Sequence, residues 1–379
     1  MKRRTTKLAA VAVTSAVALA ASANAFAAGK LTGAGSTLVA PMVENVWAPD
    51  FQKATGNSVT YGSVGSGGGI SQITAKTVDF GASDGPLTAD QATACGQCEE
   101  IPWALASTGL SYNLPGVSKL QLSGPVVADI FLGTIKNWDS PQIKKLNPHV
   151  KLPNLAITPV HRSDGSGDTY AFTHYLSSVS KTWASHVGYA TAVNWPTGTG
   201  GNGNSGVAAI VTATKGALGN NSWFYIHDDH LQPVAIENNA GKFIYPYVKN
   251  VTDAANAMLG KSVPYLGILS GGNANTVANA LSIVNAPYTK PKLVTKKVHG
   301  KTVKRPAKLT PLQKEESNAY PLSTFTYVLI RPDAKDVSLL QQFIKFAISP
   351  TEEAKGAALQ FAPLPAAVYK ADSAAVGRL

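Results

Sequence analysis

The pattern of apolar and polar residues changes its period between residues 155 and 179. Leu155–Val160 is apolar and rich in residues that favour strands, whereas a later set of apolar side chains recurs at helical spacing. The stretch between them, His161–Tyr170 (HRSDGSGDTY), is polar and rich in glycine. A strand, a turn and a helix are therefore predicted here, and the apolar face of the helix consists of Phe172, Tyr175, Leu176 and Val179.

Two stretches nearer the N-terminus repeat this arrangement. In Leu31–Pro41 (LTGAGSTLVAP), two glycines precede Ser36 and Thr37, which begin a second helical pattern. Farther on, a short strand at Val59–Tyr61 runs into the glycine-rich Gly62–Gly69. Ser66 is the expected N-cap of a helix that starts near Ile70.

The three predicted helix starts share a chemistry that suits anions. The first backbone N–H groups of a helix lack partners within it, and the helix dipole favours negative charge there. Arg162 adds a planar donor fork that matches oxyanions. Each start taken alone could equally be an ordinary capped helix, but together they predict a site for a small oxyanion.

Val78–Ala82 reads as a buried strand that ends in Ser83 and Asp84. A carboxylate beside helix N-termini would repel an anion unless the ligand carries a hydrogen that the carboxylate can accept. We therefore expect Asp84 to discriminate against fully deprotonated ions such as sulfate. A turn or helix-capping role for Asp84 is the alternative.

The remaining pattern alternates strands with helices, which predicts an α/β protein, and the length of 379 residues favours two domains. The first domain should end, and the second begin, near residue 112. The further elements expected are strands at Ile101–Tyr112 and Phe325–Ile330, and helices at Pro125–Gly133, from Asp139–Pro141 onward, at Val337–Ile348 and at Thr351–Leu359.

The first 27 residues have the layout of a signal peptide. Lys2, Arg3, Arg4 and Lys7 precede an apolar core at Leu8–Ala21, and small residues that suit cleavage follow. A retained membrane anchor is the alternative, although the apolar run is short for a membrane span. No cysteine near the cleavage region offers a site for a lipid anchor, so a periplasmic or secreted protein is predicted.

The net charge of +11 is concentrated in two segments. Of the 33 Lys and Arg residues, five lie in the first thirty positions and eight in Lys290–Lys308, so the other 20 are slightly outnumbered by the 22 Asp and Glu residues. Basicity of this kind does not indicate a nucleic-acid surface. Lys292–Val298 and Lys301–Arg305 flank His299-Gly300 and predict a protruding lysine-rich hairpin. It is either a solvated ribbon protected by charge or a docking element for anionic polymer, lipid or a partner protein.

The two cysteines, Cys95 and Cys98, are expected to form a structural disulfide, with a redox pair or half of a metal site as alternatives. Gly198-x-Gly200-x-x-Gly203 matches the dinucleotide fingerprint only formally, and it is interpreted as a loop at the surface or at the rim of a cleft. His227–His230 (HDDH) is interpreted as a solvated turn after a strand at Trp223–Ile226. No metal or catalytic constellation is predicted.

With these motifs in place, the chain closely resembles the periplasmic phosphate-binding proteins that feed Pst-type ABC importers. GAGSTLVAP, GSGGGISQITAKTVDFGASDGPL, FLGTIKNWD, RSDGSGDTYAFTHYL, GTGGNGNSGVAA and YPLSTFTYVLI occur in one order over nearly all of the mature chain. The resemblance implies a type II periplasmic-binding-protein fold, in which two α/β lobes with mixed sheets are joined by two crossover strands and close like a hinge. Lobe 1 would comprise residues 28–112 and 325–379, and lobe 2 residues 113–324, with the hairpin as an insertion at about 288–312.

The resemblance also implies the ligand contacts. Asp164 matches the acid that orients the arginine, and Asp168 departs from the family, where threonine is frequent. Asp168 could accept a second ligand hydrogen or turn away to cap its helix. The phosphate-binding set carried over is Thr37, Leu38 (through its N–H), Ser66, Asp84, Arg162, Ser166, Gly167 and Asp168.

By this resemblance the protein binds inorganic phosphate without catalysis or cofactor, as a monomer, and delivers it to the membrane permease of an ABC importer. Two other classes are weighed. One is a secreted adhesin or scavenger that holds polyphosphate or anionic polymer through the hairpin. The other is a secreted phosphohydrolase, which would normally need a metal cluster or an activated nucleophile.

Overall fold

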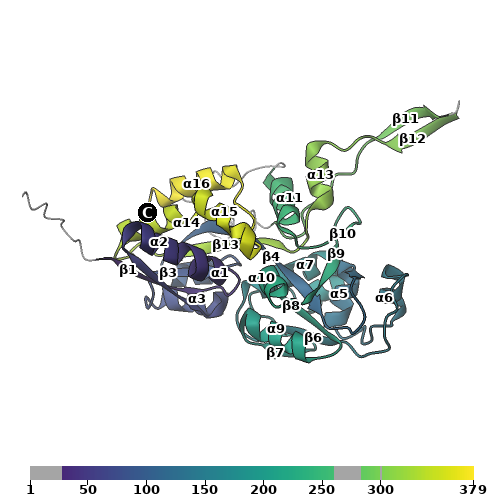
Figure 1. Ribbon diagram of the computed structural model, residues 1–379, viewed down its shortest axis with the longest axis horizontal. Helices are drawn as coiled ribbons and strands as arrows, with labels where there is room; N and C mark the ends of the chain where they lie inside the picture. The colour runs from purple at the N-terminus through teal and green to yellow at the C-terminus, as the bar shows by residue number, and fades with distance from the viewer. Residues whose placement is uncertain (1–27, 260–282, 299–300) are drawn as a thin grey trace, which may run out of the picture.

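The computed structural model of the chain describes residues 28–259, 283–298 and 301–379, and Figure 1 draws the others as a thin grey trace. The predicted signal peptide and His299-Gly300 of the predicted lysine-rich hairpin lie outside the described residues. Every helix within the described ranges is too short or too polar to cross a bilayer.

Among the described residues, a mixed sheet of eleven strands runs through the molecule. Its main path follows the order β2-β1-β3-β13-β4-β8-β6-β7, while β9 pairs with β4, β5 and β10. The strands are β1 (Lys30–Gly35), β2 (Ser58–Ser63), β3 (Phe80–Ser83), β4 (Glu99–Tyr112), β5 (Leu120–Leu122), β6 (Thr158–Arg162), β7 (Thr199–Gly201), β8 (Ala217–Ser222), β9 (Gln232–Glu237), β10 (Phe243–Ile244) and β13 (Ser323–Ile330).

Helices cover this sheet, and several begin at a side chain that accepts from a free N–H of the first turn, as Ser166, Ser180 and Asp336 do. They are α1 (Ala40–Met42), η1 (Val43–Trp47), α2 (Ala48–Thr55), α3 (Gly65–Thr74), α4 (Ala89–Ala94), α5 (Gly124–Phe131), α6 (Pro141–Leu146), α7 (Gly167–Val179), α8 (Lys181–His186), α9 (Gly203–Ala213), α10 (Trp223–Asp228), α11 (Val248–Leu259), α13 (Pro311–Asn318), α14 (Val337–Ala347), α15 (Pro350–Lys355), η3 (Gly356–Leu359) and α16 (Ala366–Val376).

The apolar side chains gather in two main cores, which gives the two-lobed α/β architecture that the resemblance implied. The first core surrounds Trp47, Phe80 and Trp103 and includes the C-terminal helices. The second surrounds Phe131 and Trp138 and includes helices α5 and α7. Figure 1 shows the two lobes side by side, with β1, β3 and α14–α16 on the left and β6, β8, α5 and α9 on the right.

Two neighbouring segments carry the chain between the lobes. β4 contributes Trp103 to the first core and Tyr112 to the second. Alongside it, Leu322 lies in the second core and Phe325 of β13 in the first, and the N–H of Thr108 in β4 donates to the carbonyl of Leu322. Because these crossovers lie side by side, they form a compact hinge between the lobes.

One helix departs from the division of the chain that we expected. Val251 and Ala255 of α11 pack into the first core, although residues 113–324 were assigned to lobe 2. We therefore propose that the boundaries between the lobes follow the two cores.

Two local predictions were wrong. Trp223–Ile226 is not a strand but the first turn of α10, where Trp223 and Ile226 lie three residues apart on one buried face. α3 begins at Gly65, so Ser66 lies inside the first turn, and the residue at the N-cap is Val64. The glycine run is helical because α3 packs closely on the sheet: a Cβ at Gly69 would come within 2.5 Å of the Cα of Gly35.

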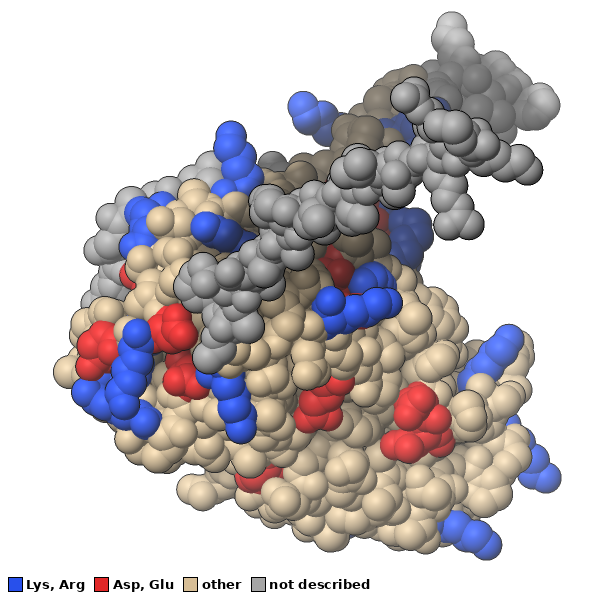
Figure 2. Space-filling view, turned by 60° about the vertical axis from the view of Figure 1, so that its left-hand side comes forward, with Lys and Arg blue, Asp and Glu red and all other residues tan. Residues whose placement is uncertain are grey.

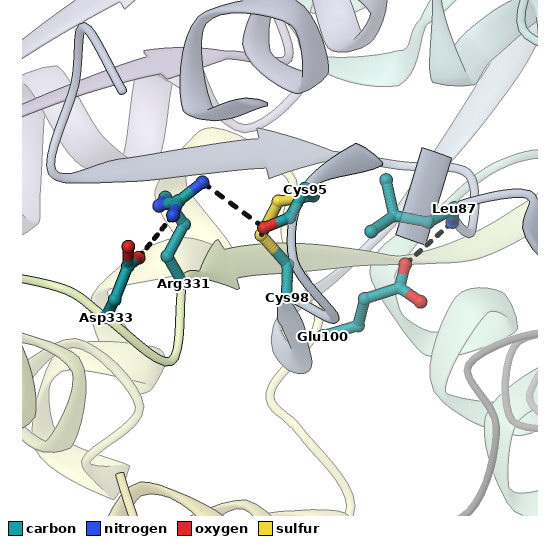
Figure 3. Close-up of a disulfide and its surroundings, with 6 residues drawn as sticks. All are labelled: Leu87, Cys95, Cys98, Glu100, Arg331 and Asp333. Atoms are coloured by element: carbon teal, nitrogen blue, oxygen red, sulfur yellow. Dashed lines mark hydrogen bonds and ion pairs between the residues drawn. A yellow bond between two sulfur atoms is a disulfide. The ribbon is translucent and has the colours of Figure 1, made fainter. Parts of the chain in front are cut away.

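The predicted disulfide is present between Cys95 and Cys98, whose Cα atoms are 5.5 Å apart. It closes the turn between α4 and β4, and Figure 3 shows Arg331 donating to the carbonyl of Cys95. Nearby, Glu100 accepts from the N–H of Leu87, and burial raises the pKa of Glu100 to about 8. These contacts fit a structural role for the disulfide, which joins the end of α4 to the start of β4.

The lysine-rich segment forms the predicted hairpin. β11 (Leu293–Val298) and β12 (Lys301–Pro306) pair antiparallel as a separate two-stranded sheet. Figure 1 shows this ribbon extending away from both lobes above α13.

We expect Phe80→Ala to lower the free energy of unfolding by about 3–5 kcal/mol, because it empties the centre of the first core. The Phe80 ring is fully buried, 5.6 Å from that of Phe343 and 5.9 Å from that of Trp103. Urea unfolding measures the change. Leu293→Ala, at a side chain that is 64% exposed, is the control, and an equal loss in both variants would contradict the prediction.

Candidate functional site

The predicted helix starts meet at one place, where strands from both lobes end. In the first lobe, β1, β2 and β3 run parallel, and their carboxyl ends lead into Ser36, α3 and Asp84. In the second lobe, β6 ends at Arg162 and leads to α7. Carboxyl ends of parallel strands share an edge of the sheet, which is the usual position of ligand sites in such folds. The predicted side chains that meet here and are buried are Thr37, Ser66, Asp84, Arg162, Ser166 and Asp168.

Asp84 lies at the centre of the first-lobe part of the site. Its Oδ2 accepts from the hydroxyls of Ser36 at 2.6 Å and Ser66 at 3.3 Å. Its Oδ1 is buried and has no hydrogen-bond partner among the described residues. Burial and the neighbouring charge of Asp168 raise the pKa of Asp84 to about 7, while Ser36, Arg162 and Ser66 act in the opposite direction. Asp84 can thus be neutral or charged near neutral pH.

The two lobes touch at Ser66. Its hydroxyl oxygen accepts from the N–H of Gly167, the first residue of α7, at 3.0 Å, and the N–H of Gly67 donates to the carbonyl of Gly165 at 2.9 Å. A Cβ at position 167 would overlap the Cβ of Asp84. The lobes can therefore close this tightly only because residue 167 is glycine.

Arg162 supplies the positive charge of the site from a side chain that is 1% exposed. Its Nε donates to Oδ1 of Asp164 at 2.7 Å and its Nη2 to Oδ2 of the same carboxylate, so the pair is bidentate. Burial alone would raise the pKa of Asp164, but Arg162 outweighs it and the pKa is lowered. Asp164 thus has the orienting position that the resemblance implied.

Asp168 faces the same guanidinium from the first turn of α7. Its Oδ2 accepts from Nη1 of Arg162 at 3.0 Å and from the amide of Asn204 at 2.8 Å. Its helix is capped by Ser166, whose hydroxyl accepts from the N–H of Asp168 at 3.1 Å. Burial raises the pKa of Asp168 even though Arg162 acts to lower it. Ser166 therefore caps α7, so the capping role considered for Asp168 is filled by Ser166.

Thr37 and Leu38 complete the first-lobe side. The hydroxyl of Thr37 accepts from Asn204 at 2.8 Å. The N–H of Leu38, expected as a ligand donor, donates to the hydroxyl oxygen of Ser36 at 3.0 Å. Ser36 therefore links the helix start to Asp84, a role that the sequence analysis did not assign to it.

Asn204 is the main residue that sequence reasoning missed. It is fully buried in the first turn of α9, and its carbonyl oxygen accepts from the N–H of Ser222 at 2.7 Å. Because its amide nitrogen donates to both Thr37 and Asp168, it connects the two lobes. The preceding residue, Gly203, donates to Asp164 at 3.0 Å. The glycine-rich loop that we interpreted as a rim thus supplies part of the site, and the only signal for it was its asparagines.

This arrangement can hold a small oxyanion. One buried cation, several hydroxyls and the first N–H groups of α7 converge where two carboxylates can accept hydrogens. Within the described ranges, no group of three or more His, Cys, Asp or Glu side chains is placed to hold a metal ion. The HDDH stretch lies at the end of α10, and all four of its residues are exposed.

Comparison with known proteins identifies related chains. A family model described as a PBP superfamily domain matches residues 20–351. A phosphate-binding protein PstS from Pasteurella multocida is 45% identical over 249 residues, which cover 65% of this chain and 72% of that protein. A phosphate-binding protein PstS from Xylella fastidiosa is 42% identical over 229 residues, or 60% of this chain, and the chain spans 62% of that relative's length.

Among solved structures, a phosphate-binding protein from Stenotrophomonas maltophilia has a TM-score of 0.62 to this structure. The match covers 91% of this chain and 93% of that one at 18% sequence identity. At this identity the likeness establishes the fold alone, and that fold is the one described above.

We expect Asn204→Ala to lower the free energy of unfolding by about 1–3 kcal/mol, because it leaves buried groups of Thr37 and Ser222 without a partner and removes one of the two donors to Oδ2 of Asp168. Urea unfolding measures the loss. Asn202→Ala is the matched control, since Asn202 is exposed and its side chain makes no capping hydrogen bond. Equal stability of the two variants would show that the amide of Asn204 does not hold the lobes together.

Proposed function

The chain belongs to the PBP superfamily and to the PstS phosphate-binding proteins within it, and from this premise we propose that it binds inorganic phosphate between its two lobes. The ion would be held by neutral N–H and O–H donors together with one guanidinium, with Asp164 keeping Arg162 in place. The proposed ligand groups are Thr37, Leu38, Ser66, Asp84, Arg162, Ser166, Gly167 and Asp168.

The observation that carries this proposal is the position of Asp84. Its buried Oδ1 lacks a partner among the described residues, and it lies near helix starts that favour an anion. A carboxylate there is compatible with a bound oxyanion only if a hydrogen lies between the two. Phosphate carries such a hydrogen at neutral pH and sulfate does not, so the site would select phosphate by its protonation.

Asp168 extends the same logic. It shares Arg162 with the proposed ligand, and its Oδ1 is also buried without a hydrogen-bond partner among the described residues. A second acceptor would suit the monobasic ion, which carries two hydrogens. We therefore propose that Asp168 accepts the second hydrogen, in place of the hydroxyl that threonine would donate.

After binding the ion, the protein would deliver it to a membrane transporter. Closure about the β4 hinge would bury the ion, and the closed protein would present it outside the cytoplasmic membrane to the permease subunits of an ABC importer, acting as a monomer. We propose a binding role without catalysis or cofactor, since the similar curated proteins are described as binding proteins. Nothing observed at the site favours hydrolysis of a phosphate ester.

We expect the protein, once freed of bound phosphate, to bind phosphate far more tightly than sulfate in isothermal titration calorimetry. In Asp84→Asn the discrimination should fall by roughly 10- to 100-fold, the worth of one hydrogen bond to a charged group, because the amide can donate to sulfate. Asp228→Asn, which neutralises an exposed carboxylate, should bind like the wild type. Equal wild-type affinities for the two ions would refute the acceptor role of Asp84.

The discrimination should also depend on pH. Because the pKa of Asp84 is raised to about 7, lowering the pH through this value protonates the carboxyl group and turns it into a donor. Sulfate binding should therefore strengthen as the pH falls through about 7 and weaken as it rises, and Asp84→Asn should flatten this dependence. Calorimetry across the neutral range tests this, and a wild-type sulfate affinity that is independent of pH would contradict it.

A further inference from the structure

Beyond the first thirty residues, the net positive charge of the protein is concentrated in one projecting element, which we call the cationic arm (residues 290–298 and 301–308). It contains seven lysines and one arginine and has no acidic residue. Charged side chains elsewhere are sparse, and on the face drawn in Figure 2 red and blue groups lie scattered over a mostly uncharged surface. The arm is thus a local cationic feature on a body that is close to balanced.

The root of the arm is firmly built. Before β11, the N–H and hydroxyl of Thr289 donate to the buried carboxylate of Glu316 in α13, at 2.6 and 3.2 Å. After β12, Thr310 and Gln313 form a capping box at the start of α13, and Gln313 also donates to the carbonyl of Thr289. Both ends of the arm are therefore fixed to one helix, which sets the direction in which the arm projects (Figure 1).

The ribbon presents apolar and cationic side chains together. Leu293 is 64% exposed, and Val294 and Val303 are each 37% exposed. Val294 pairs with Arg305, and the side chains of directly opposed residues in an antiparallel pair point to the same face. Val303 lies two positions before Arg305 on the same strand, so it shares this face as well. Leu293 pairs with Pro306, and Lys304 lies two positions before Pro306, so Leu293 and Lys304 share the other face. Each face of the ribbon thus places uncovered apolar groups next to a cation.

We propose that the cationic arm docks the protein on an anionic phospholipid surface. Cations are attracted to such a surface within about a Debye length, and neighbouring apolar side chains can enter the boundary between headgroups and acyl chains. A linear polyanion satisfies the charges but offers no apolar layer for Leu293, Val294 and Val303. The combination of both residue kinds on a fixed projection therefore favours lipid over polymer.

Docking of this kind would be useful whatever the ligand in the cleft. A protein held at the membrane meets a membrane-embedded partner at a raised effective concentration. The inference rests on the arm alone, because none of the residues proposed to bind phosphate belongs to it. Its failure and a failure of the proposed phosphate binding can therefore be told apart.

The test is co-sedimentation of the purified protein with phosphatidylcholine vesicles, with and without phosphatidylglycerol. We expect binding only to the anionic vesicles and a loss of binding at high salt. Neutralising four exposed arm cations together (Lys290→Gln, Lys292→Gln, Lys304→Gln and Arg305→Gln) should weaken binding by about 600-fold, since each surface cation contributes about fivefold. The matched control neutralises four exposed lysines elsewhere, at Lys53, Lys151, Lys181 and Lys215, and should bind like the wild type.

A second variant separates lipid from other anions. Val294→Thr with Val303→Thr keeps β-branched side chains and all charges but removes apolar surface, so vesicle binding should fall while any binding to polyphosphate stays unchanged. Phosphate affinity, measured on every variant, should stay at the wild-type value. The proposal is overturned if the wild type ignores anionic vesicles, if the control loses as much binding as the arm variant, or if polyphosphate binds and vesicles do not.

Discussion

The site depends on a guanidinium that is almost wholly removed from water. A buried cation left alone would cost several kcal/mol, and Arg162 avoids this by pairing with Asp164 and Asp168. Together with Asp84 this leaves more carboxylates than cations in one buried place, and the protein accommodates the surplus through the raised pKa values of Asp84 and Asp168. The negative charges of Asp84 and Asp168 can therefore be withdrawn by a proton, whereas Asp164, whose pKa is lowered, keeps its charge beside Arg162. This difference between the acids would let a site lined with carboxylates accept an anion.

The same groups also hold the lobes together. Ser66 accepts from Gly167, and Asn204 donates to Thr37, so residues at the proposed ligand site make contacts across the cleft. An ion that enters must replace some of these contacts with its own oxygens, and so its binding energy is coupled to the position of the lobes. The paired crossovers at β4 and β13 provide a hinge that can move without unfolding either core. In the proposed function, recognition of the ion and closure of the lobes would both result from this one set of hydrogen bonds.

Local chemistry was the predictable part of this structure. Ser166 and Asp84 stand next to glycine turns or strand ends, where a few neighbouring residues decide what a side chain can do, and both were found where the sequence indicated. Asn204 could not be predicted, because its role depends on a partner 167 residues earlier in the chain and its own neighbours resemble a surface loop. Trp223–Ile226 was misread because a short apolar run fits a strand and a helix equally well. α3 was placed too late because glycine lowers helix propensity, whereas close packing on the sheet requires it.

The distribution of charge follows from the way the site would recognise its ligand. A strongly positive body would attract phosphate and sulfate alike, because a long-range field acts on charge and cannot sense a hydrogen. Selection by protonation needs short-range donors and acceptors instead, and the near balance of 20 cations against 22 acids outside the two basic segments suits this. The ribbon that carries several of the arm's cations extends away from both lobes (Figure 1). A six-residue strand such as β11 extends roughly 20 Å, whereas the Debye length at physiological salt is about 8 Å. The fold thus separates the proposed membrane docking, which needs net positive charge, from the proposed selection of phosphate, which net positive charge would weaken.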